Sequence, residues 1–198
     1  MSERQHHRPM KPGAGFFAEI LGGQDPALVS EAADRAANLL VRGAGGSDDP
    51  AVAERVLHLA ETEGIETIAE VWSGSPADSL AGCLWRLFVL RSWVYADPTA
   101  VAREYDAGRR TAQVAQVVAG VADPPGPEEL KTMVDEVLRG IAAGEFADVL
   151  FRAAAFARVV ATGRATLEDT SEVEVARMLL LAEQLEAAGH VELAHGLA

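Results

Sequence analysis

Cysteine is almost absent from the sequence, in which Cys83 is the only thiol among 198 residues. One thiol cannot form a disulfide within the chain, and a chain without disulfides suits a reducing compartment. A free cysteine is usually a small buried hydrophobe, and we interpret Cys83 in that way. Residues 1–15 also lack the apolar core of a secretory signal. These absences predict a cytoplasmic protein.

Positive charge is also scarce. The chain has 17 lysines and arginines against 30 aspartates and glutamates, which gives a net charge of −13. A surface with this excess of negative charge repels phosphate backbones and anionic lipid headgroups, so nucleic acid is a disfavoured partner. Only two of the basic residues are lysines, and this preference for arginine beside abundant alanine is typical of a GC-rich bacterial genome.

Long apolar runs and alternating patterns are both missing. The most apolar stretch, residues 80–96, is divided by Arg86 and Arg91 and is shorter than the roughly 20 apolar residues that a membrane span needs. No segment alternates apolar and polar side chains for long enough to make a convincing strand. The sequence therefore predicts neither a membrane protein nor a β-sheet.

Helical periodicity is the dominant pattern. Residues 130–141 carry apolar side chains at i, i+3, i+4, i+7 and i+8, and similar stripes occur elsewhere. Aspartate or serine followed by proline recurs before several of these stripes, which is typical of a helix cap followed by the first helical position. We predict helices at 26–42, 50–63, 65–72, 76–96, 98–120, 127–142, 145–162 and 168–188.

The expected fold class is all-α, a bundle of seven or eight mostly antiparallel helices with short loops. We expect residues 1–13 to form a flexible N-terminal arm and residues 14–198 to form a single domain. An alternative division into two subdomains would fall near 122–127, in a stretch rich in proline.

The sequence carries no complete motif for catalysis or for cofactor binding. The sequence has no G-x-S-x-G, HExxH or DDxxD-like motif. Gly13 to Ala18 has the form of a dinucleotide fingerprint, but the residues before it cannot form the buried strand that such a site requires. Glu192 and His195 have the spacing of a helical di-iron site, but no second copy of the pair exists. We predict no catalytic residue, no cofactor and no metal.

Arg91 is the residue that most needs an explanation. Winding residues 80–97 as a helix gathers an apolar face with Arg91 near its middle, whereas Arg86 falls in a polar sector. A buried guanidinium cannot lose its proton and requires an anion. On one interpretation it is structural, lying along tryptophan rings to reach solvent or pairing with one of four carboxylates, Glu66, Glu70, Glu104 and Asp106.

The other interpretation of Arg91 is functional. It would form the floor of a pocket for an acidic ligand or for the carboxylate of a partner protein. The walls of this predicted pocket would be aromatic, namely Trp85, Trp93, Tyr95 and Tyr105.

A DNA-binding alternative uses residues 98–120. In a helix-turn-helix with Gly108 in the turn, several side chains of the second helix would face a groove of DNA, namely Arg109, Arg110, Thr111, Gln113 and Gln116. Glu104 occupies a position where this motif needs a small residue, and the net charge opposes DNA binding.

The function that we predict is a soluble, non-enzymatic, regulatory interaction module that binds a protein or a small acidic ligand. A helix-turn-helix regulator is the second hypothesis and an enzyme of unrecognised type is the third. A homodimer is a further hypothesis, because a helix that is apolar on most faces can complete its burial against a second copy.

Overall fold

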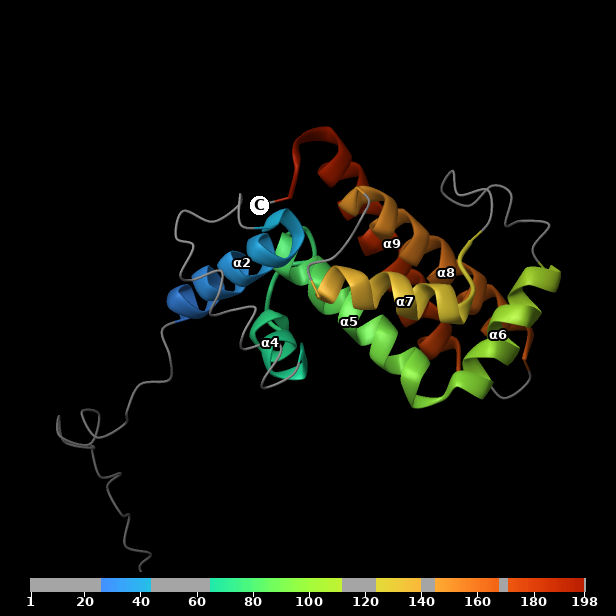
Figure 1. Cartoon of the computed structure of the whole chain (residues 1–198). Coiled ribbons are helices and arrows are strands. Elements are labelled where there is room, and N and C mark those ends of the chain that lie inside the picture. Colours follow the sequence, from blue (N-terminus) through green and yellow to red (C-terminus); the bar gives the residue numbers. More distant parts are fainter. Residues whose placement is uncertain (1–25, 44–64, 112–123, 140–144, 168–170, 198) are drawn as a thin grey trace, which may run out of the picture.

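A computed structural model describes residues 26–43, 65–111, 124–139, 145–167 and 171–197. Within these ranges the chain forms helices and no strands, so the all-α prediction is confirmed (Figure 1). The seven described helices are α2 (Pro26–Arg42), α4 (Ile65–Trp72), α5 (Leu80–Ala96), α6 (Pro98–Thr111), α7 (Pro127–Leu138), α8 (Phe146–Thr166) and α9 (Glu172–His195).

The predicted bounds of α2 and α4 are confirmed, whereas the predicted start of α5 is wrong. Pro76 belongs to the turn before this helix, and Ser79 is the N-cap, because its hydroxyl accepts a hydrogen bond from the Gly82 amide at 3.1 Å. The helices α8 and α9 both run further toward the C-terminus than predicted. The predicted helix at 50–63 and the predicted continuation of α6 beyond Thr111 lie outside the described residues.

Helix α8 lies between α6 and α9 and makes the most extensive packing contacts in the described fold. Its middle is buried on all sides and consists largely of small side chains, since four of its five residues are alanines, Ala153, Ala154, Ala155 and Ala157, beside Phe156. Figure 1 shows α8 and α9 side by side, with α6 against the other side of α8. Small side chains bring helix axes close together, so α8 forms the centre of this part of the molecule.

Two glycines allow α6 and α8 to touch through their backbones. A Cβ atom added to Gly108 would lie 1.9 Å from the Val159 carbonyl oxygen, and one added to Gly163 would lie 1.8 Å from the Glu104 carbonyl oxygen. Real Cβ atoms do not approach so closely, and the atoms that they would meet belong to the backbone. The crossing therefore depends on glycine at both positions.

Helix α5 packs against α2, α4 and α7 and reaches α9. Its first turn, residues 80–84, is buried on all sides. Beyond that turn one side is buried, because Leu87 and Val94 are fully buried whereas Val89 is 40% exposed. No described helix combines the length and the apolar character needed to cross a bilayer.

Candidate functional site

The partner of Arg91 is Asp135 of α7. The Arg91 Nε donates to one oxygen of this carboxylate, and the Tyr95 hydroxyl donates to the other oxygen at 2.8 Å. The Arg91 guanidinium lies 4.6 Å from the centre of the Tyr95 ring, and the Lys131 ammonium lies 4.8 Å from the same centre. This cluster links α5 to α7. Asp135 balances the charge of Arg91, and Lys131 pairs with Glu128 at 2.7 Å.

None of the four carboxylates expected beside Arg91 is its partner. Glu104 forms an ion pair with Arg164 at 2.7 Å, while Glu66, Glu70 and Asp106 are exposed on α4 and α6. Asp135 follows the buried Val134, at the edge of the apolar stripe that predicts α7. The position of Asp135 beside this stripe makes it a candidate partner for a buried arginine. The packing of α5 against α7, however, is a tertiary contact that sequence periodicity does not predict.

The five residues of the predicted pocket do not come together. Two residues of an α-helix correspond to about 200° of rotation, so Trp93 faces nearly the opposite side of α5 from Arg91. Trp85 and Trp93 face α9, whereas Arg91 and Tyr95 face α7. Tyr105 is buried in the core, where its hydroxyl donates to the Pro124 carbonyl at 2.8 Å. The structure thus does not gather these residues at one place, although two of them, Trp85 and Trp93, lie at a groove.

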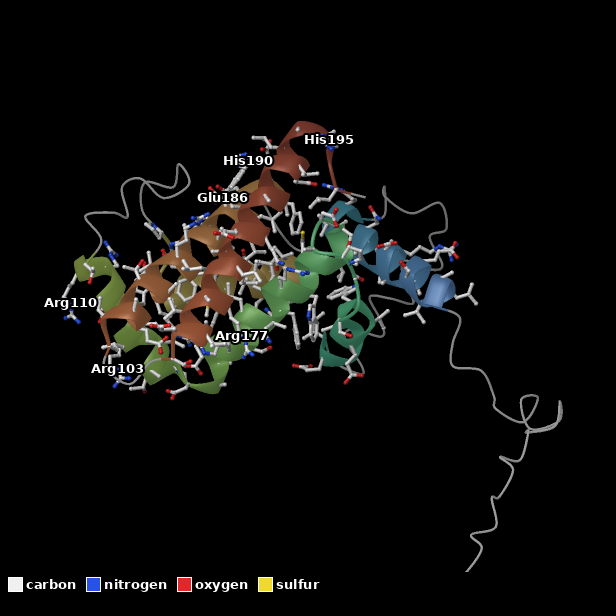
Figure 2. All side chains as sticks on the ribbon, turned by 180° about the vertical axis from the view of Figure 1, so that it is seen from behind. Arg103, Arg110, Arg177, Glu186, His190 and His195 are labelled. Carbon is white, nitrogen blue, oxygen red and sulfur yellow. The ribbon has the colours of Figure 1, made fainter. Side chains whose placement is uncertain are left out.

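This groove lies between α5 and α9, and Arg164 of α8 also lines it. Its volume is about 590 Å³, which is in the range of sites that hold small ligands. Both helices contribute apolar lining, mainly Trp85, Val89, Trp93, Met178, Leu180 and Leu181. Figure 2 views the molecule from behind Figure 1 and labels Arg177 where α9 passes α5.

Arg164 of α8 marks one end of the groove. Its guanidinium lies 4.6 Å from the centre of the Trp93 ring, and its Nε donates to Glu104 at 2.7 Å. Stacking and ion pairing hold the planar group in one orientation. The Trp93 ring is therefore fixed between the groove and a cation whose charge is balanced by Glu104.

Two further arginines line the groove without a carboxylate partner among the described residues. Arg86 donates to the Gln184 side chain and to the Gly82 carbonyl, each at 2.8 Å, and both acceptors are neutral. Arg177 is exposed and has no ion pair with any described side chain. Glu174 is the one carboxylate of the lining. Three arginines against one glutamate give the lining an excess of positive charge, which is unusual in a chain of net charge −13.

The arginines of the groove are suited to binding an anion rather than to proton transfer. A guanidinium neither gives up nor takes a proton at neutral pH. Cys83 lies in the core, and burial raises the pKa of its thiol to about 12, so it is not a nucleophile at neutral pH. Over the described ranges, no three side chains of histidine, cysteine, aspartate or glutamate gather as metal ligands.

The C-terminal cluster of acids and histidines is engaged in other contacts. Glu186 forms an ion pair with Arg158. The His190 ring packs edge-on against the Phe151 ring, with 4.9 Å between the ring centres. Glu192 accepts two hydrogen bonds from Arg42, one of them 2.7 Å long, and this contact lowers the pKa of the Glu192 carboxyl below its ordinary value. These contacts tie α9 to α8 and α2.

The helix-turn-helix hypothesis placed a turn at Gly108, and this turn is absent. Helix α6 continues through Gly108 to Thr111, and Gly108 faces the backbone of α8. Arg109, Arg110 and Thr111 are exposed in the last turn of α6, and Figure 2 labels Arg110 at this end of the molecule. The other two residues of that hypothesis, Gln113 and Gln116, lie outside the described residues.

Comparisons of the chain with family models, with curated proteins and with solved structures found no match.

Replacing Arg91 by methionine is expected to lower the free energy of unfolding by about 1–3 kcal/mol, because the Asp135 side chain is only 14% exposed and would lose its cationic partner. Thermal unfolding followed by circular dichroism measures this loss. Removing both charges, in the variant Arg91→Met with Asp135→Leu, should recover most of it. A melting temperature that stays unchanged in the single variant would contradict the structural role of Arg91.

Proposed function

We propose that this protein is a non-catalytic interaction module that binds an anionic ligand with an apolar body in the groove between α5 and α9. The ligand class includes acidic segments of partner proteins and small organic acids. The observation that carries the proposal is the combination of Trp85 and Trp93 at an open groove with Arg86 and Arg177, whose charges no described carboxylate balances.

Two features of the groove favour a ligand that is both apolar and anionic. Partly exposed indole rings leave apolar surface in water, and each arginine lacks the anion that its fork of donors could bind. A ligand with an apolar body and a carboxylate satisfies both groups at once. A cytoplasmic location is part of this proposal and is supported by the single buried cysteine.

Fluorescence quenching tests the local charge of the groove. The chain has three tryptophans, of which Trp72 is fully buried, so quenchers reach mainly Trp85 and Trp93. Iodide should quench their fluorescence better than caesium does. For this comparison, the quenching constant of each ion is divided by the constant measured with free N-acetyltryptophanamide. A net charge of −13 alone would favour caesium, so the expected order is opposite to the effect of the overall charge.

Two matched variants make this measurement specific. Arg177→Glu should reverse the preference for iodide, because it changes the charge at the groove itself. Arg110→Glu changes the net charge equally at the end of α6 and should leave the preference in place. If the unmodified protein shows no preference for iodide over caesium, the groove is not an anion site and the proposal is wrong.

A further inference from the structure

We infer that the ligand of this groove is an acidic amphipathic helix of a partner protein, and this inference rests on the proposed function. The exposed apolar surface extends beyond the groove. Val173 and Leu180 of α9 are 57% and 53% exposed, and Val89 of α5 is 40% exposed. Val173 does not line the groove, so a small ligand confined there would leave it in water. Contiguous apolar surface of this kind is typical of a protein interface.

The exposed face of α9 has the spacing of a helix-docking surface. Val173, Ala176 and Leu180 are all exposed and follow one another at i, i+3 and i+7, so they lie on one side of the helix. On α5, Trp85, Val89 and Trp93 follow at i, i+4 and i+8 and span about 12 Å. Apolar anchors of an amphipathic helix at i, i+4 and i+7 span about the same length and lie along one stripe.

Charge determines which helix fits. Arg86 lies near one end of the groove, where it bonds to Gln184, and Arg164 lies over Trp93 near the other end. The charge of Arg164 is already balanced by Glu104. Carboxylates that flank the apolar stripe of a bound helix would instead meet Arg86, whose acceptors are neutral, and the exposed Arg177. A lysine-rich helix would place its charges against the same arginines. A second copy of this chain is disfavoured because two molecules of net charge −13 repel each other.

A designed peptide tests the inference. The probe has about 16 residues and blocked ends, with leucine at i, i+4, i+7 and i+11 and glutamate at flanking positions, because shorter helices are marginal in water. It contains no tryptophan, so the emission of Trp85 and Trp93 reports its binding. The acidic peptide should bind at least about tenfold more tightly than a version with lysine in place of glutamate. It should also become more helical on binding.

Exchanging charges between the protein and the peptide tests whether Arg177 contacts the bound peptide. Arg177→Glu should weaken binding of the acidic peptide by about tenfold, and a peptide with one glutamate changed to lysine should restore it for this variant alone. Arg110→Glu is the control with equal net charge and should bind the acidic peptide as the unmodified protein does. Failure of the charge exchange, with equal loss for both variants, would overturn the assignment of this surface.

The remaining outcomes separate this inference from the proposed function. Octanoate serves as the probe for a small amphipathic carboxylate. If octanoate protects Trp85 and Trp93 from iodide while the acidic peptide does not bind, the helix inference is wrong and the groove remains an anion site. If neither probe binds, both proposals fail. If sedimentation shows a dimer that Arg177→Glu dissociates, the occupant is a second copy and the inference of a partner helix is overturned.

Discussion

Replacing Gly163 by alanine is expected to lower the free energy of unfolding by about 3 kcal/mol. The added Cβ would lie 1.8 Å from the Glu104 carbonyl oxygen and 2.7 Å from the Gly108 amide nitrogen. Both are backbone atoms, so no side-chain rotation relieves the clash, and α6 must move away from α8. For a chain of this size, the loss corresponds to a fall of about 6–12 °C in Tm, which thermal unfolding followed by circular dichroism measures.

The sign of this effect is diagnostic. Alanine in a helix interior is normally about 1 kcal/mol more favourable than glycine, so helix propensity alone would make the variant more stable. Gly74→Ala is the control, since an added Cβ there meets no atom within 4 Å, and its Tm should change little. Gly108→Ala should be as damaging as Gly163→Ala. The double variant should cost less than the sum, because one separation of the helices relieves both clashes. An unchanged Tm for Gly163→Ala would contradict the close crossing.

The bounds of α2 and α4 could be predicted from the sequence because local patterns of apolar residues and caps mark them. The start of α5 could not, because two possible caps lie close together there. Ser75 before Pro76 has the form of a cap followed by a first helical residue. Ser79 offers a cap of similar strength, and the tertiary arrangement selects it. A Cβ at Gly82 would lie 1.7 Å from the Pro76 carbonyl oxygen, so the turn folds back onto the first turn of α5.

The candidate site was only partly predictable for a related reason. Trp85 and Trp93 stand out by composition, and helical winding places them on one side of α5. No local sequence pattern indicates that α9 packs on that side of α5. Nor does one indicate that Arg177, which is 84 positions after Trp93 in the sequence, lines the same groove. Helical winding also identifies Arg91 as a charge that needs a partner, but which residue pairs with it depends on α7 packing beside α5. Periodicity gives the faces of helices, and tertiary packing decides which faces meet.

Glu104 is the residue whose removal should have the second largest effect. Its side chain is 12% exposed, and its carboxylate pairs with Arg164, whose side chain is 13% exposed. Glu104→Ala would leave a guanidinium with little access to water and no anion beside it, so we expect a loss of about 3 kcal/mol in the free energy of unfolding. Urea unfolding measures the loss. Replacing both residues by leucine should be far less costly, since no unpaired charge remains buried.

Glu104 also separates stability from binding at the groove. Glu104→Gln keeps the size of the side chain but removes the charge that balances Arg164, which lies over Trp93. We therefore expect Glu104→Gln to lower the melting temperature and, in the same variant, to tighten binding of the acidic peptide, because the groove gains a net positive charge. A merely damaged fold would weaken both properties together. Opposite changes in the two measurements would thus assign Arg164 to the surface that contacts the ligand, and parallel losses would confine it to the core.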